Sequence, residues 1–135
     1  MTPEERVREY WRRVWCEGET AYAETFYAPT FRLNEAELTA AQWAAGAAAW
    51  QAKFDGFSAT VLRMFPIDDG VVTQVRYQGR HTGDLANLPA AGRTFDVTGL
   101  DVFRFDGDRC MEHLHEADHF TMFEQLGGVL RAASE

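Results

Sequence analysis

The sequence predicts an α+β fold, with helices in the first part of the chain and a sheet of long strands in the rest. Up to about residue 54, apolar residues recur at the three- and four-residue spacing of amphipathic helices. From residue 58 the pattern changes to the alternation typical of strands with one buried face. Turn signals at 68–70 and 106–108 divide this part into hairpins. Helices followed by antiparallel strands indicate one α+β domain over residues 1–135.

The first two helices are predicted from their end signals. The segment 2–5 reads Thr-Pro-Glu-Glu, in which the threonine caps a helix and the proline occupies its first turn. This helix is expected to end at Gly18. A second, short helix is expected over 19–27, and Pro29 stops it before a short strand at 30–34.

A second capping box at Thr39 and Gln42 begins the third helix, which is expected to run to about residue 54 before Gly56 stops it. The inward positions of the three helices are expected to be Val7, Tyr10 or Trp11, Val14, Trp15, Ala23, Phe26, Tyr27, Trp43, Ala47, Trp50 and Phe54.

Four strands are predicted in the second part, at 58–67, 71–83, 93–105 and 109 to about 120. A loop at 84–91 joins the middle two, and a short helix or turn at 121–126 closes the chain. The predicted inward faces of the middle strands carry Val71, Val75, Tyr77 and His81, and Phe95, Val97, Asp101 and Phe103.

Composition excludes several classes of function. The formal net charge is −8, whereas binding to nucleic acid or to an anionic membrane surface requires clustered lysine and arginine. The sequence has no apolar run of about 18 residues that would cross a membrane, and residues 1–13 lack the apolar core of a signal peptide. With only two cysteines, both expected to be reduced, we expect a cytoplasmic protein.

Titratable residues on the apolar strand faces are the candidates for chemistry, because proton transfer uses such groups in a cavity. Asp101 would be costly to bury without compensation. It either faces a cavity with a raised pKa or forms a salt bridge with Arg80, Arg93 or Arg104. His81 is either a core histidine bonded to a carbonyl group or a residue that orients a substrate oxygen.

The last strand is rich in histidine. Residues 113, 115 and 119 share one face of an extended strand, and all three are histidines. Two histidines one residue apart can supply two metal ligands, with His81 or Asp101 as a third. The alternative is general base catalysis, for which imidazole is suited near neutral pH. We expect no metal and no other cofactor.

Four motifs of the second half resemble the SnoaL-like polyketide cyclases of the nuclear transport factor 2-like superfamily. His81-Thr82-Gly83 corresponds to the family's H-x-G, and residues 89–93 correspond to P-x-x-G-R. Residues 99–104 match G-x-D-x-F-R in full. Residues 112–115 read E-H-L-H where the family has E-H-W-D, so His115 stands in place of the family's acid/base aspartate.

The resemblance implies a cone-shaped barrel, in which three N-terminal helices pack on a strongly curved, mostly antiparallel sheet. It implies a cofactor-independent enzyme that acts on a polycyclic or aromatic polyketide-type substrate, by aldol ring closure or a related isomerisation or hydroxylation. The alternative is a small-molecule-binding or dimerisation module without catalysis, which the change from aspartate to histidine favours.

His115 is the expected base, and Asp101 and His81 would orient it or stabilise an enolate oxygen. The resemblance also implies a homodimer or homotetramer formed through the outer sheet face, where Leu100 and Val102 are apolar. The residues expected to bind an apolar or aromatic substrate are Asn34, Trp15, Tyr10, Trp50, His113 and Tyr77.

Overall fold

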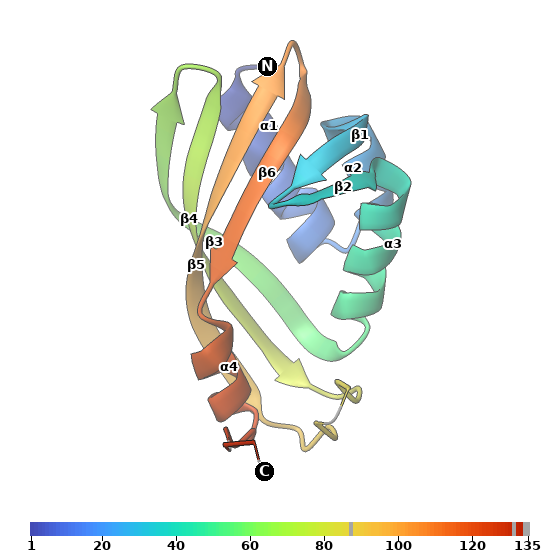
Figure 1. The fold of residues 1–135 in the computed structure, drawn as a ribbon, viewed down its shortest axis with the longest axis vertical. Coiled ribbons are helices and arrows are strands. Elements are labelled where there is room, and N and C mark those ends of the chain that lie inside the picture. The colour runs from blue at the N-terminus through green and yellow to red at the C-terminus, as the bar shows by residue number, and fades with distance from the viewer. Residues whose placement is uncertain (87, 131, 134–135) are drawn as a thin grey trace.

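A six-stranded, strongly bent sheet forms the frame of the protein (Figure 1). The computed structural model describes residues 1–86, 88–130 and 132–133. Neighbouring strands follow the order β2-β1-β6-β5-β4-β3, and all pairs are antiparallel except β1 with β6. The strands are β1 (Tyr27–Leu33), β2 (Ala36–Thr39), β3 (Phe54–Ile67), β4 (Gly70–His81), β5 (Thr94–Asp106) and β6 (Arg109–Ala117).

The helices before β3 lie against the inner side of this sheet, as the predicted cone requires (Figure 1). Helix α1 (Pro3–Tyr10) continues directly into a π-helical turn (Trp11–Cys16). A 3₁₀ turn (Thr20–Tyr22) leads into α2 (Ala23–Phe26), and the capping box at Thr39 starts α3 (Ala40–Gln51). Helix α4 (His119–Gln125) follows β6 near the C-terminus.

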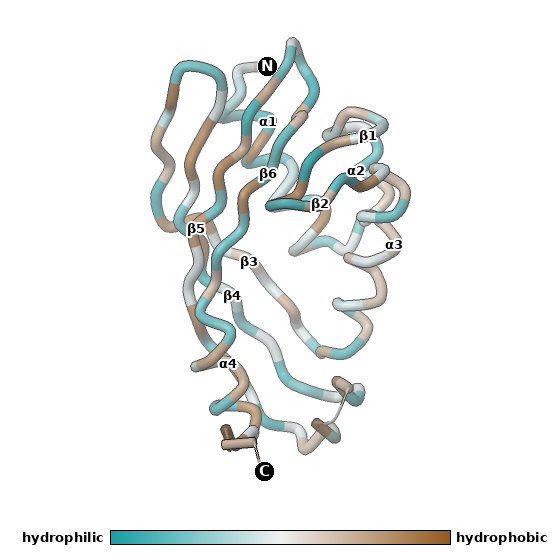
Figure 2. Tube along the Cα trace, viewed as in Figure 1, coloured by the Kyte–Doolittle hydropathy of each residue, from teal (hydrophilic) through white to brown (hydrophobic). Residues whose placement is uncertain are grey.

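The alternation predicted for the long strands is confirmed. The four inward residues predicted on β4 and the four predicted on β5 are all buried. Figure 2 shows the corresponding alternation of polar and apolar positions along these strands. The wider π turn also resolves the choice between Tyr10 and Trp11, since both are buried.

Three local expectations were wrong. Strand β2 was not predicted; Asn34, at a φ of 52°, reverses the chain so that residues 36–39 pair with β1. The third helix was expected to reach about residue 54, but α3 ends at Gln51 and Phe54 is the first residue of β3. The last strand ends at Ala117 because the Asp118 side chain accepts a hydrogen bond from the Thr121 backbone and starts α4.

Gly99 allows the close approach of β5 and β6 beside the candidate site. A Cβ added at this position would lie 2.7 Å from the backbone oxygen of Glu116 and 2.9 Å from Cβ of Ala117. Gly99→Ala is therefore expected to lower the free energy of unfolding by about 1–3 kcal/mol, measured by urea denaturation. Gly46→Ala in α3 is the control; no atom lies within 4 Å of the added carbon, so stability should be retained or rise. Equal effects of the two changes would contradict this account of Gly99.

Candidate active site

A cavity of about 370 Å³ lies between the inner face of the sheet and the helices. Its walls are mainly aromatic, with Trp15, Trp43, Trp50, Phe57 and Phe95 among them. The polar exceptions are concentrated on β5, β6 and the start of α4, where Asp101, His113, His115 and His119 line the cavity. Such a pocket is suited to an apolar ligand that presents one polar edge.

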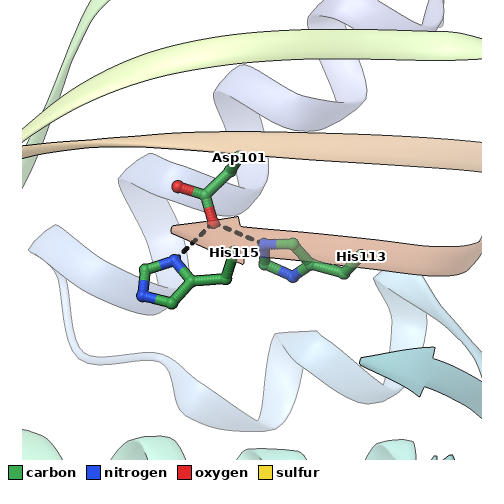
Figure 3. Close-up of side chains that lie close together, drawn as sticks. All are labelled: Asp101, His113 and His115. Carbon is green, nitrogen blue, oxygen red and sulfur yellow. Dashed lines mark hydrogen bonds and ion pairs between the residues drawn. The ribbon is translucent and has the colours of Figure 1, made fainter. Parts of the chain in front are cut away.

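Asp101 is the centre of the polar side of the cavity (Figure 3). Its side chain is fully buried, and its Oδ1 lies 2.6 Å from His113 Nε2 and 2.7 Å from His115 Nδ1. The Tyr77 hydroxyl donates to Oδ2 over 2.8 Å. The strand register produces this convergence, because β5 and β6 pair Asp101 directly with His115 and Phe103 with His113.

These hydrogen bonds keep Asp101 ionised. Burial alone would raise its pKa, but the hydrogen bonds from His113 and His115 act in the opposite direction, and the pKa is lowered to about 2. The expectation of a raised pKa was therefore wrong. So was the suggested salt bridge with Arg80, Arg93 or Arg104, because the ion-pair partners of Asp101 among the described residues are His113 and His115.

An ionised carboxylate only accepts hydrogen bonds, so both ring nitrogens that face Asp101 carry hydrogen. His115 consequently has its hydrogen on Nδ1 when neutral, which leaves the Nε2 lone pair free. Burial tends to lower the pKa of His115, but the hydrogen bond and charge of Asp101 raise it above 6.5. The His115 side chain is 28% exposed, whereas those of His113 and Asp101 are 2% and 0% exposed. His115 is thus the member of the cluster most accessible to a ligand.

A second layer of hydrogen bonds surrounds the cluster. The Tyr27 hydroxyl lies 2.8 Å from His113 Nδ1 and 2.7 Å from the Tyr10 hydroxyl. The indole nitrogens of Trp15 and Trp43 donate to the same Tyr10 oxygen, over 3.0 and 3.1 Å. Tyr10, Trp15, Trp50, His113 and Tyr77, all predicted to bind substrate, border the cavity.

His81 does not join the cluster, contrary to expectation. It is on the predicted face of β4, but Thr73 is the residue of β4 that pairs with Asp101. His81 follows eight positions later, about 26 Å along the strand. Its ring is fully buried beside Phe54, with centroids 5.7 Å apart, and neither ring nitrogen has a hydrogen-bond partner among the described residues.

Asn34 also lies outside the cavity lining, contrary to its predicted contact with substrate. Its side-chain oxygen accepts a hydrogen bond from the His115 backbone nitrogen over 2.9 Å, and its own backbone nitrogen donates to the His113 oxygen over 3.0 Å. Asn34 therefore fixes the β1–β2 turn to the part of β6 that carries both histidines.

Sequence reasoning did not assign His119 and Met122 to the site. Both extend from α4 to the cavity, and the His119 ring centroid is 5.7 Å from that of His115. Burial, and then the proximity of His115, lower the pKa of His119 below 6.5. The regular spacing of 113, 115 and 119 placed His119 on the correct side, although it belongs to a helix. Nothing in the sequence distinguished Met122 from core methionines.

Asp101, His113 and His115 are also the residue types that bind metal ions, and their donor atoms all lie within 4.8 Å of one another. Ligands of a tetrahedral zinc ion, at about 2.0–2.1 Å from the metal, are separated by about 3.3 Å. The nitrogen–oxygen distances here, 2.6 and 2.7 Å, are shorter and correspond to direct hydrogen bonds. The arrangement fits protons shared between these groups better than a metal ion between them.

The sequence matches the family model of the SnoaL-like polyketide cyclases over residues 5–126, and the chain therefore belongs to this family. No curated protein matches it. None of the helices within the described residues is long and apolar enough to span a membrane.

Solved structures confirm the fold. TsrD from Streptomyces laurentii has a TM-score of 0.85 at 22% identity, over 94% of this chain and 96% of that one. A SnoaL-like polyketide cyclase from Agrobacterium tumefaciens gives 0.82 at 12% identity, over 94% and 99%. A protein with a ketosteroid isomerase-like fold from Catenulispora acidiphila, in complex with trimethylamine, gives 0.74 at 19% identity, over 96% of both chains.

Proposed function

We propose that this protein is a cofactor-independent enzyme that removes a proton from the carbon next to a ketone of an aromatic, polyketide-type substrate. The observation that carries the proposal is the pair formed by Asp101 and His115. The carboxylate bonds the imidazole at Nδ1, which leaves Nε2 available for chemistry, and the His115 side chain lines an apolar cavity. The family's polyketide cyclase description supports the choice of substrate class.

The chemistry follows from the charges. When His115 Nε2 takes a proton from the substrate, the ring becomes positive beside a buried negative carboxylate, which stabilises it. The electron pair of the broken C–H bond moves to the ketone oxygen and forms an enolate. The enolate carbon can then attack a second carbonyl group, whose π electrons move to its oxygen and take the proton back from His115; this is an aldol ring closure. Alternatively the enolate can take that proton at another carbon, which is an isomerisation.

His119 is the described residue best placed to stabilise the enolate oxygen, one of the two roles predicted for Asp101 and His81. It borders the cavity next to His115, and burial lowers its pKa, which favours a neutral ring with one N–H that can donate a hydrogen bond. His119 thus supplies the second of the two groups that an enolisation needs, a base and a hydrogen-bond donor.

The cavity size limits the substrate. An apolar cavity of about 150 Å³ holds one benzene molecule, so about 370 Å³ has room for roughly two or three fused six-membered rings. Flat rings also suit walls made of indole and phenyl groups. We therefore propose a bicyclic or tricyclic aryl ketone, or a chain folded to that size, as the substrate.

The proposed function is tested with 1-tetralone, a two-ring aryl ketone, in deuterated buffer. NMR follows the replacement of its α-hydrogens by deuterium. The enzyme should accelerate this exchange well above the rate in buffer alone. Binding of the ketone without any acceleration would contradict the enzyme and support the alternative, a non-catalytic binding module.

The pH dependence of this exchange is a second test. His115 must be neutral to act as a base, so the rate should rise with pH and level off above the pKa of His115. Because the Asp101 hydrogen bond raises that pKa, the midpoint should lie above 6.5, the ordinary value of imidazole. A midpoint below 6.5, or a rate independent of pH, would exclude His115 as the base.

Apolar residues on the outer face of the sheet support the proposal that the protein forms a homodimer. A row of apolar residues crosses four neighbouring strands there, since the register aligns Phe65 with Val72, Val72 with Val102, and Val102 with Leu114. Phe65 and Leu114 at its two ends are 48% and 38% exposed, and Leu100 beside the row is 53% exposed. An exposed apolar row of this length on a soluble protein is typical of an interaction surface.

Sedimentation equilibrium should therefore show a dimer or tetramer, which Leu114→Glu converts to monomer. Val129→Glu is the control, because Val129 is equally apolar and 69% exposed but lies beyond the sheet. A monomeric wild-type protein would overturn this proposal, and so would a Leu114→Glu protein that keeps the wild-type mass.

A further inference from the structure

Whether His113 is neutral or charged depends on whether its second ring nitrogen, Nδ1, accepts or donates a hydrogen bond. Nε2 donates to Asp101, as shown above. Nδ1 lies 2.8 Å from the Tyr27 hydroxyl, which can either donate to it or accept from it. If Tyr27 donates, His113 is neutral. If Tyr27 accepts, both ring nitrogens carry hydrogen and His113 is a cation.

The donor and the acceptor of each hydrogen bond can be assigned by starting at the indole nitrogens, the end of the chain of hydrogen bonds farthest from His113. The indole nitrogens of Trp15 and Trp43 can only donate, and both point at the Tyr10 oxygen. A hydroxyl oxygen has two acceptor positions, and the two indoles occupy them. The Tyr10 hydrogen must then be donated, and among the described residues the Tyr27 oxygen, 2.7 Å away, is the partner that remains.

The directions of the remaining hydrogen bonds follow from this step. With the Tyr10 hydrogen directed at the Tyr27 oxygen, the Tyr27 hydrogen is free to reach His113 Nδ1. The opposite direction would place three donors on the Tyr10 oxygen and leave the Tyr10 hydrogen, which is fully buried, without an acceptor. An unsatisfied buried donor costs about 1–3 kcal/mol. Burial is also the main cause of the raised pKa of Tyr10 and Tyr27, so both hydroxyls keep their hydrogens.

We propose that Trp15 and Trp43 fix the direction of this chain, and that His113 is thereby held as a neutral positioning residue with its hydrogen on Nε2. His113 then gives Asp101 a hydrogen bond without neutralising its charge. The consequence for catalysis rests on the proposed function: the full negative charge of Asp101 remains available to stabilise His115 when it takes a proton. The protonation state itself does not depend on any substrate.

The ¹⁵N NMR spectrum of the four histidines in the free wild-type protein tests the proposal directly. At pH 7 the His113 ring should show one nitrogen bearing hydrogen, Nε2, and one bearing a lone pair, Nδ1. Two nitrogens with the shift of an imidazolium ion, or hydrogen on Nδ1 alone, would overturn the proposal. No substitution and no substrate is needed, so this result stands whether or not the exchange assay detects activity.

Tyr27→Phe gives an independent test, because the two directions predict different ¹⁵N spectra. If Tyr27 donates to neutral His113, its removal should leave one nitrogen bearing hydrogen and one bearing a lone pair, and the Nδ1 signal should move toward that of a nitrogen without a hydrogen bond. If Tyr27 accepts from a cation, its removal should turn the two signals of an imidazolium ion into those of a neutral ring. That change, or an Nδ1 signal that does not move, would contradict the proposal.

Tyr22→Phe is the matched control, since Tyr22 lies under the Arg13 guanidinium and takes no part in the chain. It should leave the Nδ1 signal of His113 unchanged. The groups packed around the His113 ring are Tyr10 of α1, Tyr27 of β1, Trp43 of α3, Asp101 and Phe103 of β5, and His115 of β6.

Discussion

Asp101→Asn is expected to reduce the rate of α-hydrogen exchange by about 10³–10⁴-fold. The amide has nearly the size of the carboxylate but lacks its charge, so nothing offsets the positive charge that forms on His115. The amide nitrogen, if turned toward the histidines, also presents a donor where both rings need an acceptor. The midpoint of the pH profile should move to lower pH, because the charge of Asp101 raises the pKa of His115.

Asp96→Asn is the matched control for this change. It makes the same chemical replacement on the same strand, but Asp96 is exposed and pairs with Arg76 on the sheet surface. Its exchange rate should remain within about threefold of the wild type, since exposed ion pairs contribute little. Similar rates for both variants would show that Asp101 serves only the fold.

Removal of the base gives the second large effect. His115→Gly should reduce the exchange rate by about 10²–10⁴-fold, because the general base is lost while the cavity and Asp101 remain. Free imidazole in the buffer should restore part of the rate, since the missing side chain leaves room beside Asp101 for the same ring. The measurement is the exchange rate as a function of imidazole concentration.

The Asp101→Asn protein provides the comparison for this rescue. It retains the His115 ring and lacks a carboxylate, so added imidazole should not restore its rate. A His115→Gly protein that exchanges at the wild-type rate without imidazole would show that another group removes the proton.

The pair at the centre of the site could be predicted from local pattern. Asp101 and His115 each occupy an inward position by the two-residue period of a strand, and the tight turn at 106–108 makes their strands neighbours. The family motif identified the same two positions. At position 115 the proposed base is an imidazole where the family motif has a carboxylate, and Asp101 places a carboxylate beside it from the adjacent strand.

The errors about the site have one physical cause. Alternation along a strand gives the face on which a residue lies, but not its position along the strand. Alternation placed His81 on the inner face correctly, but only the β4–β5 register shows that it lies eight residues beyond Thr73, the partner of Asp101. Asn34 and Tyr27 depend on the parallel pairing of β1 with β6, which joins segments about 80 residues apart. No local period carries that information.

The most direct test of the account is the structure of the protein with 1-naphthol, which has the flat ring and the hydroxyl of the enol of 1-tetralone. Its rings should lie among the indoles of the cavity. C2, the ring CH adjacent to the carbon that bears the hydroxyl, should be within about 3.5 Å of His115 Nε2, and the hydroxyl itself should face His119. A molecule bound with its hydroxyl turned away from β6, or bound outside the cavity, would contradict the assignment of His115 as the base.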